Sequence, residues 1–179
     1  MFGKGFLQDV RHNLWECFFI THSLRKDLPM KLTTIIPVHN AEKYITATLD
    51  SVLQQDLGNP EELEVICVDD ASTDASVALI KDYQQKDSRI RLFLNEKTRF
   101  AGACRNKGIE EAHGDYLHFL DADDLVEKGA YQKYLSIAEQ AGADMVKGCA
   151  VCFDNETGEL SDTPLFALSD VPLSASIRF

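Results

Sequence analysis

The alternation of short apolar runs with helical patterns is the feature that most constrains this chain. Four apolar runs have the length of a β-strand, namely Leu32–Val38, Leu63–Asp70, Ile90–Leu94 and Tyr116–Leu120. A segment with the periodicity of a helix follows each run. Strands that alternate with helices form a mostly parallel sheet covered on both faces. The sequence therefore predicts an α/β fold, with a Rossmann-like sheet between two helical layers (three layers, α/β/α).

Local signals predict where these helices begin and end. Asn40 is a predicted N-cap, because its side chain can accept a hydrogen bond from a following first turn. His113-Gly114 is a predicted C-cap. The expected helical segments are Ile45–Leu53, Val77–Tyr83, Gly102–Ala112 and Ala130–Gln140, and a fifth strand is expected over Asp144–Phe153.

Polar residues follow each predicted strand. They are Pro37–Asn40, Asp69-Asp70, Asn95 and Asp121–Asp124. Parallel α/β sheets bind ligands at the carboxyl ends of their strands, so these four segments are expected to share one binding edge.

Three carboxylates, those of Asp121, Asp123 and Asp124, end the fourth apolar run abruptly. Carboxylates repel one another, and Mg²⁺ or Mn²⁺ prefers oxygen ligands of this kind. The cluster therefore predicts a site for a divalent metal and a diphosphate. A polar loop with three solvated aspartates is the alternative.

Five motifs in register resemble the family 2 glycosyltransferases, which have the GT-A nucleotide-sugar-binding fold. They are Ile35–Asn40, Val68–Asp74, Ala103–Ile109, Ala112–Tyr116 and Phe119–Asp124, within a resemblance that covers roughly Lys31–Phe153. Two departures stand out. His39 occupies a position where the family usually has Tyr, and the loop Asn95–Gly102 is longer and more basic than usual.

The resemblance implies roles for individual residues. Asp70 would accept a hydrogen bond from the uracil N–H, and Asp123 would bind a metal that bridges two phosphates, with Asp121 and Asp124 in support. Asp121 would also contact the ribose, or it would position the loop that follows the fourth predicted strand. The backbone of Pro37, Val38, His39 and Asn40 would line the base and ribose pocket. The remaining nucleotide-sugar contacts would come from Glu42, Arg99, Arg105 and Ala122, with Lys97 as a further phosphate candidate.

Simpler roles remain open for several of these residues. Asp70 could cap the next helix, and Arg105 could pair with an acidic neighbour. Lys97 and Arg99 could be solvated loop charges. His39 could be a packing substitute for Tyr. His118, inside a predicted strand, is expected to be a satisfied core residue rather than a ligand.

The resemblance implies a metal-dependent enzyme that transfers sugar from a UDP-sugar, with inversion, to a hydroxyl of a glycan or lipid-linked acceptor in cell-envelope polysaccharide synthesis. Its general base and acceptor half are expected beyond Phe179, so residues 31–179 would be the donor-binding part. Two alternatives are a nucleotide-binding module without turnover and a sugar-nucleotide pyrophosphorylase. The pyrophosphorylase would need a Gly-rich, Arg-containing loop after the first strand, which Val38–Glu42 lacks.

Charge and cysteine usage limit the surroundings of the chain. The net charge of −11 argues against binding to nucleic acid. Five scattered cysteines without a secretory signal favour a reducing cytoplasm. Residues 1–30 are expected to form an amphipathic helical extension with a stripe of Leu7, Val10, Leu14 and Phe18. This stripe would lie on the inner face of the cell membrane, or on the chain's own domain or a second subunit.

Overall fold

The computed structural model describes residues 17–20 and 31–147 of the 179. The elements run in the order β1 (Cys17–Ile20), β2 (Leu32–Val38), α1 (Ile45–Leu53), the 3₁₀ turn η1 (Pro60–Glu62), β3 (Leu63–Asp69), α2 (Ser76–Lys86), β4 (Ile90–Leu94), α3 (Phe100–Glu111), β5 (Tyr116–Phe119), α4 (Ala130–Ala141) and β6 (Met145–Lys147). No described helix is both long enough and apolar enough to cross a bilayer.

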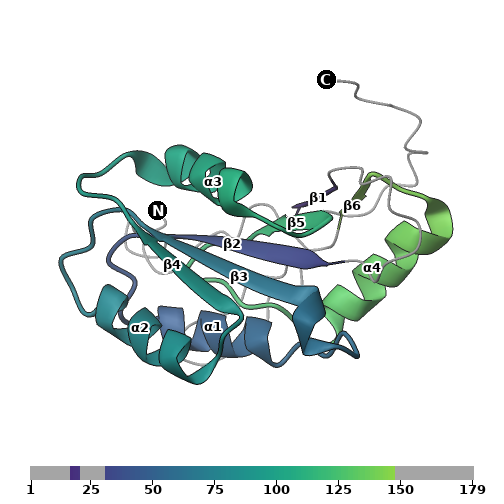
Figure 1. The fold of residues 1–179 in the computed structure, drawn as a ribbon, viewed down its shortest axis with the longest axis horizontal. Coiled ribbons are helices and arrows are strands. Elements are labelled where there is room, and N and C mark those ends of the chain that lie inside the picture. The colour runs from purple at the N-terminus through teal and green to yellow at the C-terminus, as the bar shows by residue number, and fades with distance from the viewer. Residues whose placement is uncertain (1–16, 21–30, 148–179) are drawn as a thin grey trace, which may run out of the picture. The chain divides into compact units, whose positions relative to one another are not determined.

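The strands form one six-stranded sheet in the order β4-β3-β2-β5-β1-β6 (Figure 1). β2 pairs in parallel with β3 and β5, and β3 pairs in parallel with β4. The predicted parallel α/β sheet is therefore confirmed for these four strands. Their carboxyl ends lie at one edge, as a parallel arrangement requires.

β1 was not expected. It pairs antiparallel with both β5 and β6, through Phe18 opposite His118 and Val146. The helix predicted for residues 1–30 is wrong at Cys17–Ile20, and the rest of that range lies outside the described residues. Aromatic and β-branched residues favour a strand, and the gap between β5 and β6 supplies a partner on each side.

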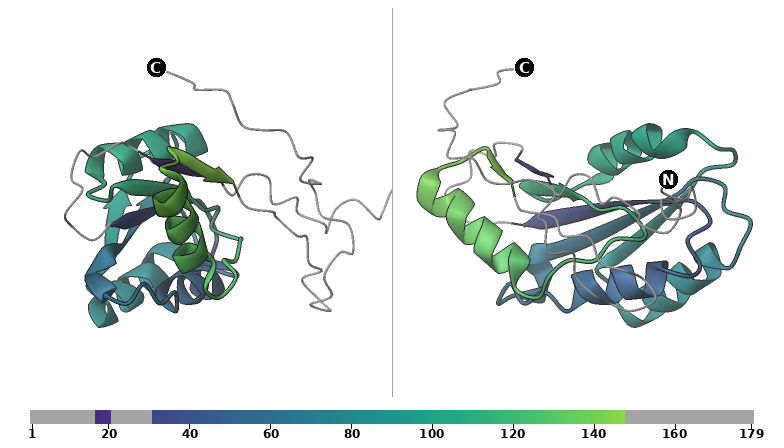
Figure 2. Two further views of the ribbon diagram at one scale, coloured as in Figure 1. Left: turned by 90° about the vertical axis from the view of Figure 1, so that its right-hand side faces the viewer. Right: turned by 180° about the vertical axis from the view of Figure 1, so that it is seen from behind.

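Alternate residues of each strand face opposite helical layers. Ile36 of β2 packs in the larger core cluster with residues of α1, α2 and α4, including Tyr131. Ile35, its neighbour, packs on the other face with Cys104 of α3. The views in Figure 2 show α3 on the face opposite α1 and α2. The three-layer prediction is confirmed.

α1 spans Ile45–Leu53 as predicted, but Asn40 has a positive φ of 50° and does not cap that helix. The chain first makes a turn in which Tyr44 and Ile45 both donate to the oxygen of Ala41. The predicted C-cap at His113-Gly114 is also wrong, because α3 ends at Glu111 and its C-cap is Ala112 in an extended conformation. α3 begins at Phe100, two residues earlier than predicted. Of the expected fifth strand, Met145–Lys147 is observed, and residues 148–153 lie outside the described part.

Close packing of α3 on the sheet depends on Gly108. A Cβ at this residue would lie 2.3 Å from Cγ2 of Ile35 in β2. Only glycine therefore lets the helix approach the strand this closely. This contact determines how far the side chains of α3 lie from the ends of β2 and β5.

Candidate functional site

Asp70, directly after β3, is the most heavily bonded carboxylate at the predicted binding edge. Its Oδ1 accepts from the backbone N–H of Arg99 (2.8 Å) and from Asn95 Nδ2 (3.0 Å). Its Oδ2 accepts from the backbone N–H of Phe100 (2.8 Å). A carboxylate offers about four lone-pair positions, so these three bonds leave about one position, for which the weak thiol donor of Cys104 competes with a ligand.

The environment of Asp70 keeps it ionised. It is only 4% exposed, and this desolvation opposes the charged form. The hydrogen bonds from Arg99, Asn95 and Phe100 outweigh desolvation and lower the pKa of Asp70. Asp70 thus anchors the loop between β4 and α3 and can still accept one bond from a ligand.

The alternative role of Asp70, as a cap of the next helix, is not observed. Its partners belong to the β4–α3 loop, whereas the first turn of α2 is bonded by Asp74, whose Oδ1 accepts from Ser76 N–H (2.9 Å) and Ser76 Oγ (2.6 Å). Asp69, which precedes Asp70, accepts from Ser72 N–H. The side chain of Asp69 lies toward the α1 and α2 layer because successive strand residues alternate.

Two loops are joined by reciprocal hydrogen bonds beside Asp70. Asn40 N–H donates to Ser72 Oγ (2.9 Å), and Asn40 Oδ1 accepts from Thr73 N–H (2.8 Å). The carboxylate of Glu42 accepts from Ala75 N–H (2.9 Å). These bonds hold the loops after β2 and β3 together, so the side chains of Asn40 and Glu42 serve the loop structure first.

The other predicted residues of β2 fall into two groups. Val38 is buried in the core and its oxygen accepts from Asp70 N–H (2.7 Å), so its side chain cannot face a ligand. His39 is exposed, and its Nδ1 donates to the oxygen of Asp70 (2.8 Å). His39 therefore supports the loop after β3 through a hydrogen bond. Pro37 is half-buried.

Arg105 of α3 pairs with Asp121, the first aspartate after β5. Its Nη2 lies 2.6 Å from Asp121 Oδ1, and the two side chains are 35% and 45% exposed. The pairing of Arg105 with an acidic neighbour is thus confirmed. That neighbour belongs to the predicted metal cluster, so the ion pair also places a positive charge at the binding edge.

The aspartate cluster does not form a ready-made metal cage. Asp124 is buried, Asp123 is half-buried and Asp121 is paired with Arg105. Among residues 17–20 and 31–147, no three His, Cys, Asp or Glu side chains are placed to hold a metal ion together. Mg²⁺ commonly uses one or two carboxylates together with substrate phosphates and water, so the set fits a cation that arrives with a diphosphate.

The basic loop after β4 lies next to this edge. Lys97 and Arg99 are exposed, and their side chains form no ion pair with another described residue. Arg99 is held through its backbone by Asp70. Its charge is therefore available to an anion at the carboxyl end of β3.

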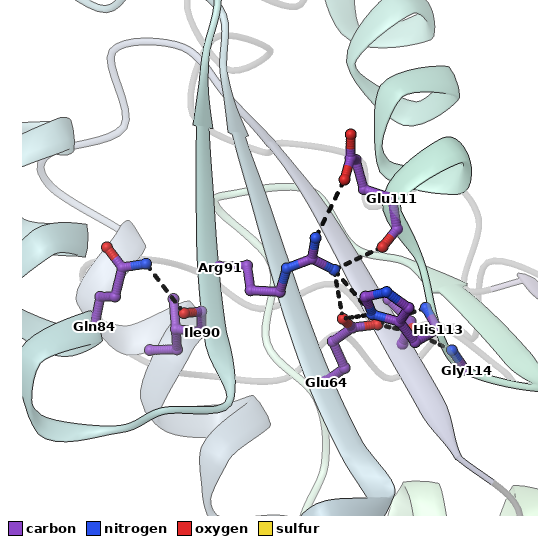
Figure 3. A network of polar contacts seen from close by, with 8 residues as sticks. Glu64, Gln84, Ile90, Arg91, Glu111, His113 and Gly114 are labelled. Carbon is purple, nitrogen blue, oxygen red and sulfur yellow. Dashed lines mark hydrogen bonds and ion pairs between the residues drawn. The ribbon is translucent and has the colours of Figure 1, made fainter.

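A polar network at the opposite edge of the sheet fixes the other end of α3 (Figure 3). Arg91 Nη1 donates to Glu64 Oε1 (2.7 Å) and to the oxygen of Glu111 (2.6 Å). Glu64 Oε2 accepts from His113 N–H (2.9 Å) and Thr33 Oγ1 (2.7 Å). Half-burial of Glu64 opposes ionisation, but these hydrogen bonds outweigh it and lower its pKa. α3 is thus held at both ends, at Asp70 and at Glu64.

Sequence reasoning missed the buried polar side chains of α1 and of Gln55, which lies two residues after its end. Thr48, Ser51 and Gln55 are at most 4% exposed and bond to the backbone of the segment after β5. Their spacing of three and four residues was the available signal, but α1 was identified only from its apolar residues. His118 is buried and bonded to Tyr131 OH (2.8 Å), as expected for a core residue.

Comparison with curated proteins gives two informative relatives. An uncharacterised glycosyltransferase of Haemophilus influenzae is 36% identical over 129 residues, which are 72% of this chain and 50% of that protein. The poly(ribitol-phosphate) beta-glucosyltransferase of Bacillus spizizenii is 34% identical over 120 residues, 66% of this chain and 19% of that protein. The chain therefore spans half or less of these relatives.

Solved structures give the same architecture. S. aureus TarS (residues 1–349, in complex with UDP) has 32% identity and a TM-score of 0.58, covering 62% of this chain and 32% of that one. Mannosyltransferase PcManGT from Pyrobaculum calidifontis, in complex with GDP-Man and Mn²⁺, has 26% identity and a TM-score of 0.53, covering 57% and 30%. The profile of glycosyl transferase family 2 matches residues 33–174. By this match and by its GT-A fold, the chain belongs to glycosyl transferase family 2.

Proposed function

We propose that this chain binds a UDP-sugar and that the protein transfers the sugar, with inversion, to a hydroxyl of a glycan or lipid-linked acceptor. One observation carries the proposal. Asp70, an ionised and buried carboxylate that accepts hydrogen bonds, lies at the same sheet edge as the Arg105–Asp121 ion pair. The UDP complex of TarS supports the choice of nucleotide.

Asp70 and the basic loop residues suit different parts of the UDP-sugar. The remaining acceptor position of Asp70 suits the imide N–H of uracil, because an ionised carboxylate can only accept. Arg99 and Lys97 suit the anionic diphosphate. In the transfer, the acceptor oxygen bonds to the anomeric carbon while the bond from that carbon to the UDP oxygen breaks, and the hydroxyl proton passes to a general base.

A divalent cation completes the proposal. Asp123, with Asp121 and Asp124 nearby, would hold Mn²⁺ or Mg²⁺ against the diphosphate. Bound there, the cation would stabilise the negative charge of the departing UDP as a Lewis acid. The Mn²⁺ in the PcManGT complex supports this choice of ion. The name of the Bacillus spizizenii relative supports an acceptor in cell-envelope polysaccharide synthesis, which would place the protein in the cytoplasm or at the inner membrane face.

Calorimetry of UDP binding with Mn²⁺, and again with EDTA, tests both parts. We expect strong binding only with the metal, and we expect Asp123→Asn to lose most of the difference because it removes a charge while keeping the shape. The matched control is Asp82→Asn, the same change at an exposed position of α2. Equal affinity with Mn²⁺ and EDTA would remove the metal from the proposal, and absence of UDP binding would overturn the nucleotide assignment.

A further inference from the structure

Three buried polar side chains form one stripe, two of them on α1 and the third, Gln55, two residues after that helix ends at Leu53. Thr48, Ser51 and Gln55 are 0%, 4% and 4% exposed. Residues spaced by three and four positions lie on the same side of a helix. Buried polar groups are costly unless they are hydrogen-bonded, so their partners indicate what this stripe is for.

Each of the three bonds to the backbone of the segment between β5 and α4. Thr48 Oγ1 donates to the oxygen of Ala122 (2.8 Å), a shorter bond than its alternative within α1 to Tyr44 (3.3 Å). Ser51 Oγ accepts from Val126 N–H (3.1 Å). Gln55 Nε2 donates to the oxygen of Glu127 (2.9 Å).

This segment has no regular secondary structure of its own. Residues 120–129 form no helix or strand, although Ala122, Asp124 and Val126 are buried. Leu120 N–H donates to Ile35 of β2 (3.1 Å), Asp124 N–H to Asp121 (3.1 Å), and Ala130 N–H, at the start of α4, to Glu127 (3.0 Å). The stripe of α1 therefore fixes the height of the segment over the sheet, and Thr48 bonds the carbonyl between Asp121 and Asp123.

We infer that Thr48, Ser51 and Gln55 are positioning residues that place the aspartates after β5 for a nucleoside diphosphate and its divalent cation. The inference rests on the proposed function for the identity of the ligand. A misplacement of about 1 Å in an active site can lower the reaction rate by about two orders of magnitude, so the position of such groups matters. Side chains that never touch the ligand would thus control diphosphate affinity from the helix beneath the loop.

The test compares Thr48→Val with Thr48→Ser, which restores the hydroxyl. We expect Thr48→Val to weaken UDP binding with Mn²⁺ about tenfold, the loss of one hydrogen bond with the displacement that follows, and Thr48→Ser to bind within about threefold of the parent. Uridine, which lacks phosphates, should bind both variants like the parent. A merely destabilising change would not separate these ligands.

Thr33→Val is the matched control. Thr33 is also 0% exposed, and its hydroxyl donates to Glu64 (2.7 Å) and accepts from Gly114 N–H (2.9 Å) at the opposite edge of the sheet. It should lower stability without changing UDP affinity. Unchanged UDP affinity in Thr48→Val, or an equal loss in Thr33→Val, would overturn the inference.

Hydrogen exchange of the free chain provides a readout that needs no ligand. Ser51→Ala removes the acceptor of Val126 N–H, so this amide should exchange at least about tenfold faster while amides of β2 keep their protection. If the parent binds no UDP, the proposed function fails and the exchange result alone decides whether α1 holds the segment. Unchanged exchange at Val126 would overturn the inference independently.

Discussion

At the scale of single residues, Asp70 meets two demands with one carboxylate. It organises the loop that carries Arg99, and it leaves about one acceptor position toward the ligand. A carboxylate that is already ionised and held in place needs little reorganisation when a ligand N–H donates to it. Loss of Asp70 should therefore weaken binding of the uracil base and also loosen the β4–α3 loop. Ligands with and without a base separate the two effects.

Asp70→Ala should weaken UDP binding by about 1–3 kcal/mol, the usual cost of a lost charged hydrogen bond. Pyrophosphate, which has no base, should weaken much less. Asn95→Ala is the control, because it removes one of the loop bonds but keeps the carboxylate. Calorimetry with both ligands measures the difference. Equal losses for UDP and pyrophosphate in Asp70→Ala would show that Asp70 is an anchor of the loop and not a base reader.

Phe100 has a backbone conformation that disfavours its own side chain. Its φ is 66° and its side chain is 76% exposed, so little burial offsets the strain. The left-handed region costs an L-residue about 1–2 kcal/mol, but glycine adopts it freely. Phe100→Gly should therefore be more stable than Phe100→Ala, by up to about 1 kcal/mol in urea unfolding. Ala101→Gly, one residue further into α3, should instead lower the stability, because glycine disfavours a regular helix.

At the scale of elements, the position of α3 is a compromise between helix propensity and close approach. Gly108 weakens the helix, but it allows contact with Ile35 and so places Arg105 against Asp121. A helix held by capping interactions at both ends and by one glycine in the middle has little freedom to slide. Its packing on the sheet and the geometry of the ion pair are therefore coupled.

Gly108→Ala should destabilise the protein by about 1–3 kcal/mol, because the new Cβ overlaps Ile35. It should also weaken UDP binding by moving Arg105. Adding Ile35→Ala should recover part of both losses, which a double-mutant cycle detects as coupling. Gly102→Ala in the same helix has no atom within 4 Å of its new Cβ and should stabilise α3 slightly. Strict additivity of the Gly108 and Ile35 changes would refute this account.

The elements also show what sequence could and could not predict. Apolar runs of strand length sufficed to predict β2, β3, β4 and β5, because buried parallel strands are near-continuous apolar runs. β1 was not predicted, because four residues are too few to show a periodicity that distinguishes a strand from a helix. Its partner strands also lie far along the chain. The prediction that Asn40 caps a helix was wrong, because its side chain accepts a hydrogen bond from Thr73 N–H. Local propensity cannot indicate a contact between two loops.

The candidate site shows the same division. The aspartates and Arg105 followed from spacing and from the family resemblance. The bonds of Asp70 to the β4–α3 loop, and the polar stripe of α1, depend on tertiary contacts between segments that are distant in sequence. Sequence patterns predicted which groups meet at the edge, but not which of them hold the others in place.

At the scale of the whole molecule, one buried histidine links stability to pH. Burial lowers the pKa of His118 from 6.5 to about 3. The unfolded chain binds a proton there as the pH falls below about 6.5, whereas the folded chain does not until about 3. The free energy of unfolding should therefore decrease with falling pH across this range, by at most about 1.4 kcal/mol per unit.

His118→Asn should reduce this slope, because the amide can still bond Tyr131 OH but does not titrate. Urea unfolding at several values between pH 7 and pH 5 measures the slope before the carboxylates begin to protonate. An unchanged slope in His118→Asn would assign the acid sensitivity to other groups.

The place of β1 in the sheet has a consequence for synthesis on the ribosome. β1 is translated before every other described element, yet it pairs with β5 and β6, which are translated after most of the remaining chain. At about 5–20 residues per second, the wait is on the order of 5–20 s. During that time β5 can pair with β2 while its other edge stays open to foreign strands. The earliest strand to be made is among the last to find its partners, so nascent chains need protection at the β5 edge until β1 closes it.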